Sequence, residues 1–156
     1  MLTSSPLKRS QPVRGAFERI APLADADWAA VSRWLRVRTV TRGALLLRPG
    51  EACDYLGFLT RGALRTYNLT YEGDEQTGWL AVEGMFVTEL LSFYAQEPTR
   101  EHVEAIEDAE VHYLTHADLE ALYRDTDGVE TLGRRFLEQI MVELKEHLLS
   151  QLHDGM

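Results

Sequence analysis

Residues able to perform metal, acid–base or nucleophilic chemistry are few in this sequence and lie far apart. His112 and His116 are four residues apart, a spacing that can place two ligands on one helical face. We expect the first at the end of a strand and the second at the start of a helix, so they would not share a face. His-x-His, the pair that holds a metal in double-sheet enzymes, does not occur. We therefore predict no metal and no other cofactor; the remaining histidines are His102, His147 and His153.

The only cysteine, Cys53, excludes an internal disulfide. A lone cysteine without a clear histidine partner is more often a small buried hydrophobic side chain than a nucleophile. One cysteine is also too few for an iron–sulfur sensor. Because the sequence contains neither a P-loop nor a Gly-x-Gly-x-x-Gly motif, we predict that the chain is not an enzyme.

Length and charge indicate the class of protein. A chain of 156 residues with 45% hydrophobic residues favours one domain with a single core. With 25 acidic and 16 basic residues the net charge is -9, which argues against binding nucleic acid through overall charge. The sequence has no run of about 18 apolar residues and no apolar signal segment at its start. We therefore expect a cytoplasmic protein with no membrane partner.

The middle of the chain, residues 37–115, has the pattern of a β protein. Apolar and β-branched runs alternate with turns at Gly50, Gly62, Gly73 and Gly84, where glycine permits a tight reversal. Many short strands at nearly regular spacing favour a closed barrel or a double-sheet roll over a parallel sheet. The expected strands are Ala44–Leu47, Tyr55–Leu59, Ala63–Leu69, Thr77–Ala81, His102–Ala105 and Glu110–Leu114.

The N-terminal part is predicted to contain a mobile leader and a helix. Residues 1–14 are polar and include two prolines, which is typical of a leader. A helix at about 26–36 follows, with Asp25 as its N-cap. Its apolar residues Trp28, Val31, Trp34 and Leu35 fall on one face. We expect these tryptophans to belong to the core, together with Phe58, Tyr67, Trp79, Phe86 and Phe93.

Two helices are expected at the C-terminal end. Thr115 with Asp118 forms the pattern of a capping box, and Asp127 with Glu130 forms a second one, so a new helix would begin near Gly128. Apolar residues then recur every three or four positions over about 24 residues, or about 36 Å. A helix of that length extends beyond a small barrel, and a second copy of the chain is the simplest partner for its stripe. The predicted homodimer interface is Leu132, Phe136, Ile140, Leu144 and Leu148.

Two long segments carry a family resemblance: RGALLLRPGEACDYLGFLTRGALRTY, and EGMFVTELLSF followed by PTREHVEAIEDAEVHYLTHADLEALY. They resemble the two halves of the cyclic-nucleotide-binding barrel of the Crp/Fnr transcription-regulator superfamily, in its Bacteroidetes form. The resemblance covers about residues 15–153. It implies a mainly β fold with flanking helices, that is, a double-stranded β-helix or jelly roll, plus a long C-terminal dimerisation helix. It also implies an effector-sensing domain involved in transcriptional regulation.

The resemblance also implies a ligand site. In the family a glutamate binds the ribose 2′-hydroxyl, and an arginine binds the phosphate together with N–H groups of a short helix. Glu89, followed by Leu90, matches that glutamate, but Thr88 stands where the family has glycine, and its β-carbon hinders approach of a phosphate to the backbone. Thr99 falls at the arginine position, and Arg100 comes one residue later, where a strand would turn its side chain to the other face. A one-residue slip in the preceding loop would let Arg100 take the arginine's place, so that alternative stays open. We therefore expect a pocket for a small anionic ligand, cyclic nucleotide or other, that does not bind cAMP in the usual way.

Regulators of this superfamily continue after the long helix into a winged helix-turn-helix, whereas this sequence ends at Met156. Within residues 126–156 acidic residues outnumber basic ones, the reverse of a DNA-facing segment. We therefore expect no direct DNA binding by this chain. The expected organisation is a leader at 1–14, a β-roll with N-terminal helices at 15–125 and a dimerisation helix at 126–156.

Two other interpretations stay open from the residues alone. A cupin-like small-molecule enzyme would share the double-sheet barrel, although the His-x-His pair is missing. A ligand-free interaction module would fill the pocket near Glu89 with its own side chains.

Overall fold

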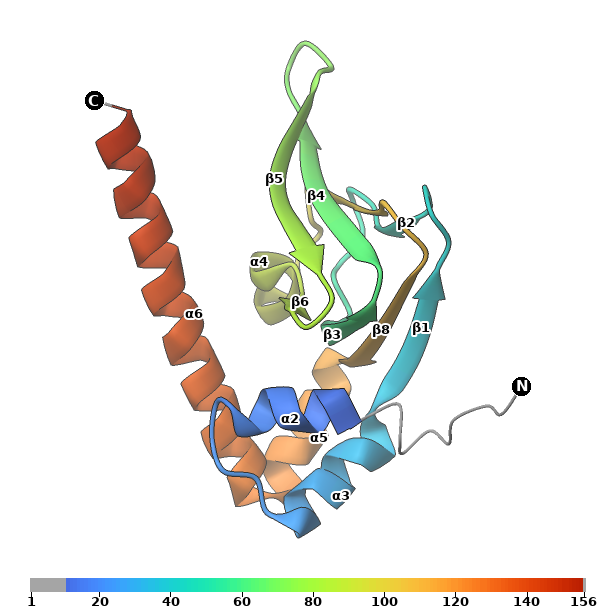
Figure 1. Ribbon diagram of the computed structural model, residues 1–156, viewed down its shortest axis with the longest axis vertical. Coiled ribbons are helices and arrows are strands. Elements are labelled where there is room, and N and C mark those ends of the chain that lie inside the picture. The colour runs from blue at the N-terminus through green and yellow to red at the C-terminus, as the bar shows by residue number, and fades with distance from the viewer. Residues whose placement is uncertain (1–10, 156) are drawn as a thin grey trace.

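The computed structural model describes residues 11–155, which form two four-stranded antiparallel sheets with helices at one end and α6 along one side (Figure 1). The strands are β1 (Arg36–Val40), β2 (Leu45–Leu47), β3 (Leu56–Arg61), β4 (Ala63–Leu69), β5 (Glu75–Val82), β6 (Phe86–Val87), β7 (His102–Ala105) and β8 (Ala109–Leu114). Their order is β1-β8-β3-β6 in the first sheet and β2-β7-β4-β5 in the second. The predicted mainly β jelly roll with flanking helices is confirmed.

Alternation of side chains along paired strands separates the core from the surface. Leu64 on β4 lies opposite Ala105 on β7, and both are buried. One residue along, Arg65 lies opposite Glu104 on the other face and forms an ion pair with it, with 3.4 Å between Nε and Oε1. The core therefore lies between the two sheets and extends to the helices; fully buried side chains include Leu59, Phe93, Val111 and Leu122.

All six predicted strands are present, with bounds that differ by no more than two residues. The prediction missed β1 and β6. β1 is an edge strand of the first sheet with only Val40 buried, so its charged sequence lacks the alternation expected of a half-buried strand. β6 has two residues, too few for any periodicity.

The helices are α2 (Gln11–Glu18), α3 (Asp25–Trp34), α4 (Leu90–Ala95), α5 (His116–Asp125) and α6 (Asp127–Asp154). The capping box of Thr115 and Asp118 at the start of α5 is confirmed. The other two predicted caps are wrong, because Ala24 and Thr126 occupy the N-cap positions of α3 and α6 and neither makes a side-chain cap bond. Asp25 and Asp127 are instead the first helical residues, where a carboxylate still interacts favourably with the helix dipole.

The predicted leader extends too far into the chain. Residues 11–14 form the first half of α2, and Val13 is fully buried. The apolar residues of this short helix are interrupted by Gly15 and Arg14, which weakens its periodic pattern in the sequence. Residues 1–10 lie outside the described residues.

Two tryptophans expected in the core lie at the surface. Trp34 is 39% exposed because it is the last residue of α3, and Trp79 is 52% exposed because β5 is an edge strand. Trp28, Phe58, Tyr67 and Phe93 are buried as predicted, and Phe86 is half-buried.

Helix α6 divides into a buried half and an exposed half. Leu132 and Phe136 are buried within the same chain, and the Phe136 ring lies edge-to-face against Phe86 with centroids 5.2 Å apart. Ile140 is half-buried, and every residue from 141 to 155 is exposed. The C-terminal half runs alongside the roll, away from the other helices, and ends below the tip of the hairpin of β4 and β5 (Figure 1). The prediction that part of its apolar stripe is left uncovered by its own chain is confirmed. Within residues 11–155, no helix combines the length and apolar character needed to cross a membrane.

Candidate ligand-binding site

The predicted ligand residues lie on one continuous stretch, residues 86–101, which we call the α4 segment. It begins with β6, whose Phe86 lies opposite Phe58 of β3 in the first sheet. It continues through α4 and then reaches β7 in the second sheet. The segment therefore crosses from one sheet to the other, and its ends are held by strand pairing.

Glu89 is the N-cap of α4. Its backbone is extended, with φ -104° and ψ 102°, and its carboxylate accepts a hydrogen bond from the backbone N–H of Ser92 at 3.2 Å. This is a common use of an acidic side chain at a helix start. Leu90 follows as the first residue of the helix. The carboxylate that the resemblance assigns to a ribose hydroxyl is thus already engaged with its own helix.

Thr88 is also engaged within the protein. Its hydroxyl donates a hydrogen bond to the carbonyl oxygen of Tyr55 at 2.8 Å and lies 3.8 Å from the sulfur of Cys53. A glycine at position 88 could make neither contact. Thr88, which replaces the glycine of the family pattern, therefore connects the α4 segment by a hydrogen bond to the residues that precede β3.

Cys53 is completely buried, as predicted for a structural cysteine. Burial raises the pKa of its thiol, and the backbone contacts with Glu89 and Tyr55 only partly offset this. A thiol with a raised pKa is a poor nucleophile at neutral pH. Cys53 therefore contributes packing here.

Ser92 is a site residue that sequence reasoning missed. It is 1% exposed, and its hydroxyl accepts a hydrogen bond from the N–H of Cys53 at 2.8 Å and donates one to the carbonyl of Glu97. Gln96, in a left-handed conformation with φ 54°, donates to the carbonyl of Phe93. The available signal was a small polar residue inside the apolar run LLSFY, which indicates a buried hydrogen bond.

Thr99 occupies the position expected for the phosphate-binding arginine and is 5% exposed. Its backbone pairs with the loop after β2: its N–H donates to Glu51 at 2.8 Å, and its carbonyl accepts from Gly50 at 2.9 Å. Its hydroxyl accepts a hydrogen bond from the N–H of Glu101 at 3.1 Å. The side chain at the position that the sequence resemblance assigns to the family's arginine is thus buried, neutral and internally bonded.

Arg100 is exposed, and within the described residues its guanidinium forms no ion pair or hydrogen bond. Consecutive residues of extended chain point to opposite sides, so buried Thr99 and exposed Arg100 cannot both face the interior. The side chain of Arg100 therefore lies at the surface, on the side opposite to the buried side chain of Thr99.

The charge around the α4 segment is negative. Burial raises the pKa of the Glu101 carboxyl, and the nearby negative charge of Glu89 raises it further. Two interacting carboxylates, with a neutral Thr99 at the position of the arginine, disfavour a bound phosphate. Thr88, Glu89, Leu90, Thr99 and Arg100 line neither the cavity between the first sheet and the helices nor the hollow beside Gly62.

Residues 37–126 match the family described as Cyclic nucleotide-binding domain. This stretch runs from β1 to the end of α5 and includes the entire α4 segment. No curated protein matches the chain in sequence.

Solved structures show the same fold. A cyclic nucleotide-binding domain from Methylobacillus flagellatus superposes with a TM-score of 0.76 at 15% identity, covering 93% of this chain and 83% of the other. The sensor domain of the transcriptional regulator DNR from Pseudomonas aeruginosa gives 0.72 at 16%, covering 92% and 93%. The Thermus thermophilus catabolite activator protein gives 0.67 at 22%, covering 84% of this chain. This chain spans 62% of the length of the Thermus protein.

Proposed function

Because the chain belongs to the cyclic nucleotide-binding domain family, we propose that it is a Crp/Fnr-type effector-sensing module in transcriptional regulation that does not bind cAMP in the usual way. The similar structures are named as regulators or nucleotide-binding proteins, which supports a non-catalytic role. A cytoplasmic location is part of the same proposal.

The neutral Thr99 at the arginine position carries this proposal. A charge-assisted hydrogen bond to an ion contributes about 1.5–3 kcal/mol, so its loss weakens binding by one to two decades. Glu89 and Glu101 add a negative field that a phosphate would have to overcome. A small anionic ligand of another kind would need contacts other than those of the family pattern.

A second candidate function, a ligand-free interaction module, is favoured by the internal hydrogen bonds of the α4 segment. Thr88, Glu89 and Ser92 all bond to neighbouring protein atoms. A segment closed by its own side chains has less need of a ligand to be ordered.

The exposed half of α6 supports a homodimer. Leu144 is 38% exposed and Leu148 58%, and Met141, Leu149 and Leu152 are exposed beside them. Contiguous apolar surface of this kind is rare on a monomer. Because Leu132 and Phe136 are buried in their own chain, the proposed interface begins at Ile140.

Calorimetric titration tests the nucleotide part of the proposal. We expect cAMP and cGMP at 0.1 mM, roughly the scale that detects Kd values of tens of micromolar, to give no saturable heat. A thermal-shift series with cyclic mono- and dinucleotides extends the search, since any ligand that binds only the folded state raises its stability. Low-micromolar cAMP binding that is abolished by Glu89→Ala would contradict the proposal.

A further inference from the structure

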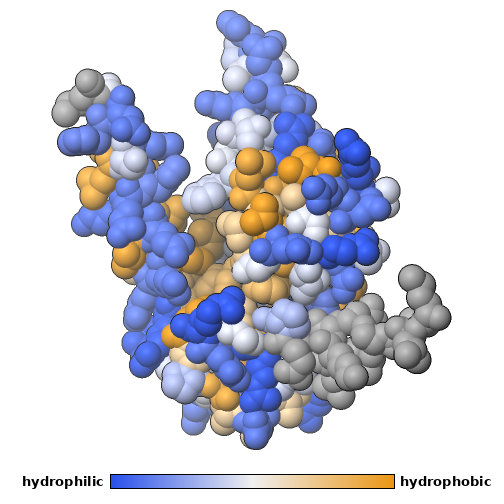
Figure 2. Space-filling model, viewed as in Figure 1, coloured by the Kyte–Doolittle hydropathy of each residue, from blue (hydrophilic) through white to orange (hydrophobic). Residues whose placement is uncertain are grey.

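A cavity of about 30 Å³ lies between the first sheet and the helices α2, α3, α5 and α6, and Phe86 is the one residue of the α4 segment that lines it. Its walls include Leu56 and Phe58 of β3, His112 of β8 and Leu132 of α6. Figure 2 shows a hollow between α6 and the roll whose floor is hydrophobic. This cavity is therefore separate from the predicted nucleotide site.

The walls of the cavity are almost entirely apolar. Among the described residues that line it, only His112 and Tyr123 carry a polar side-chain atom, and none is an acid, a lysine or an arginine. A carboxylate or phosphate placed here would lose its hydration without a counter-charge. The chemistry of the walls therefore selects an uncharged and mainly apolar molecule.

His112 supplies the one unsatisfied polar group. Its side chain is 1% exposed, and its Nε2 lies 2.8 Å from the carboxylate of Glu110. When the imidazole is neutral and its Nε2–H donates to that carboxylate, Nδ1 carries a bare lone pair. Nδ1 is buried and has no hydrogen-bond partner among the described residues. Buried acceptors in folded proteins nearly always bond to a donor from the protein, a water or a ligand, so Nδ1 is a position at which a donor group can bind.

Aromatic side chains gather on one side of the same cavity. Phe86 is the centre of the group, with ring centroids 5.6 Å from Phe17, 5.5 Å from Phe58 and 5.2 Å from Phe136. All four rings line the cavity. Offset and edge-to-face contacts with such rings favour an aromatic ligand.

We propose that this cavity binds a small uncharged aromatic molecule with one hydrogen-bond donor, of the phenol class, whose hydroxyl donates to Nδ1 of His112. The enclosed volume exceeds the roughly 10–15 Å³ that one water needs and is smaller than the cavity of about 150 Å³ that admits benzene in other proteins. The ring therefore requires the surrounding side chains to move outward. Because Phe136 belongs to α6, binding displaces that helix relative to β6.

The test compares phenol with anisole, which has the same ring but no donor, and with benzoate, which is charged. Titrations by calorimetry and by NMR of ¹⁵N-histidine-labelled protein use the full chain. We expect phenol to bind at least tenfold more tightly than anisole, benzoate not to bind, and the Nδ1 resonance of His112 to move upfield with phenol. In His112→Phe, phenol binding falls to the level of anisole. In Leu132→Phe, which fills the cavity and keeps the imidazole, both ligands weaken.

Glu89→Ala serves as the matched control, because Glu89 does not line the cavity; phenol binding is expected to be unchanged. Circular dichroism confirms that each variant is folded. Absence of phenol binding at millimolar concentration overturns the inference, as does equal affinity for phenol and anisole. Full phenol affinity in a folded His112→Phe variant also overturns it.

Discussion

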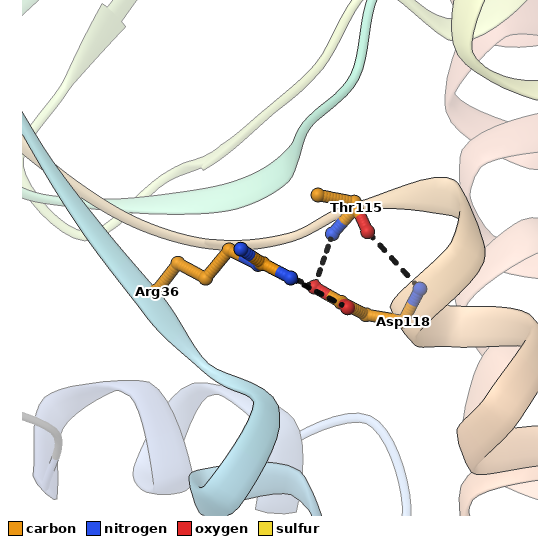
Figure 3. Close-up of polar contacts among 3 residues, drawn as sticks. All are labelled: Arg36, Thr115 and Asp118. Carbon is orange, nitrogen blue, oxygen red and sulfur yellow. Dashed lines mark hydrogen bonds and ion pairs between the residues drawn. The ribbon is translucent and has the colours of Figure 1, made fainter.

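The guanidinium of Arg36 binds both carboxylate oxygens of Asp118, at 2.8 and 3.1 Å, and so connects the first strand to the helix that follows the last strand (Figure 3). Asp118 is 2% exposed and also accepts a hydrogen bond from the N–H of Thr115, whose hydroxyl accepts one from the N–H of Asp118. One carboxylate therefore completes a helix cap and pairs with an arginine that is 82 residues away in sequence.

Replacing this carboxylate should destabilise the fold in a pH-dependent way. Burial alone would raise the pKa of Asp118, but hydrogen bonds from Arg36 and Thr115 outweigh it and hold that pKa below the usual 3.8. Asp118→Asn is expected to lower the free energy of unfolding by about 1–3 kcal/mol at pH 7. The pKa of Asp118 is lower in the folded than in the unfolded chain, so its ionised carboxylate stabilises the fold fully at any pH above the unfolded-state pKa. That stabilisation is lost as the pH falls through the folded-state pKa. Urea unfolding measured from pH 7 to pH 3 should therefore show that the difference in unfolding free energy between Asp118→Asn and the unsubstituted chain becomes smaller at the acid end.

The control for this experiment is Glu138→Gln, which removes an exposed ion pair with Arg134 on α6. Its effect should stay within about 0.5 kcal/mol. If the difference in unfolding free energy between Asp118→Asn and the unsubstituted chain stays constant down to pH 3, the charge of Asp118 is not the cause of the destabilisation.

Two glycines with the same backbone angle should differ in their tolerance of alanine. Gly62 and Gly73 have φ values of 89° and 90°, a conformation that costs an L-residue about 1–2 kcal/mol. A β-carbon on Gly62 would also overlap the carbonyl oxygen of Asp108 and lie 2.8 Å from the Cα of Ala109, whereas one on Gly73 meets nothing within 4 Å. We expect Gly62→Ala to cost at least about 1 kcal/mol more than Gly73→Ala. Equal midpoints in urea unfolding would contradict this.

Restoring the missing arginine should create affinity for cyclic nucleotides. The double variant Thr88→Gly, Thr99→Arg supplies both family residues, and we expect it to bind cAMP at least tenfold more tightly than the unsubstituted chain. Arg100→Ala, which removes an exposed side chain, should leave cAMP binding unchanged. Fluorescence anisotropy with a labelled cAMP measures all three proteins. If the double variant is folded and gains nothing, the closed α4 segment rather than the lost charge prevents binding.

Charges placed on the exposed half of α6 should prevent self-association. We expect the unsubstituted chain to sediment as a dimer at tens of micromolar and Leu144→Glu with Leu148→Glu to sediment as a monomer, because a buried glutamate must be desolvated. Gln139→Glu adds a charge to an exposed polar position of the same helix and should leave the dimer intact. A monomeric unsubstituted chain at that concentration would refute the proposed interface.

The 156-residue chain itself should not recognise a DNA sequence. Specific recognition places a helix or ribbon with donors and acceptors against base edges, whereas the exposed half of α6 combines apolar residues with Glu143 and Glu146. The net charge of -9 also repels a duplex at long range. Anisotropy titrations with randomised duplexes at physiological salt should show no saturable binding below about 1 µM. Sequence-selective binding in that range would be incompatible with this expectation.

Most of the fold could be predicted because it depends on local signals. Glycine turns bound the strands, and the capping box at Thr115 marks the start of α5. The sequence could not show β1, since an edge strand with only Val40 buried has no periodic apolar pattern. It also could not show how far the roll covers α6, because the buried Phe136 and the exposed Leu148 belong to one continuous stripe.

The position of the candidate site could be predicted from the sequence, but the hydrogen bonds of its residues could not. Glu89 and Thr99 were placed from the family pattern, and the structure puts them on the same segment. The hydrogen bonds of Thr99 and the contacts of Thr88 depend on the loop before β3; Thr88 and Cys53 are 35 residues apart in sequence. The burial of His112 could not be predicted, because its apolar surroundings come from four separate helices and the first sheet. Such convergence of distant segments leaves no spacing signal in the sequence.

Helix α6 is packed along its first ten residues, and beyond them the ring of His147 lies 5.3 Å from that of Trp79 on β5. The exposed half is therefore a lever arm whose pivot lies near Phe136 and which rests against the edge of the second sheet. From Phe136 to Asp154 its axis measures about 27 Å at 1.5 Å per residue. A rotation of about 10° at Phe136 therefore displaces the end of the helix by about 5 Å, the length of one helical turn. Small changes in the packing of Phe86 against Phe136 would thus produce a larger displacement of the C-terminal end of α6.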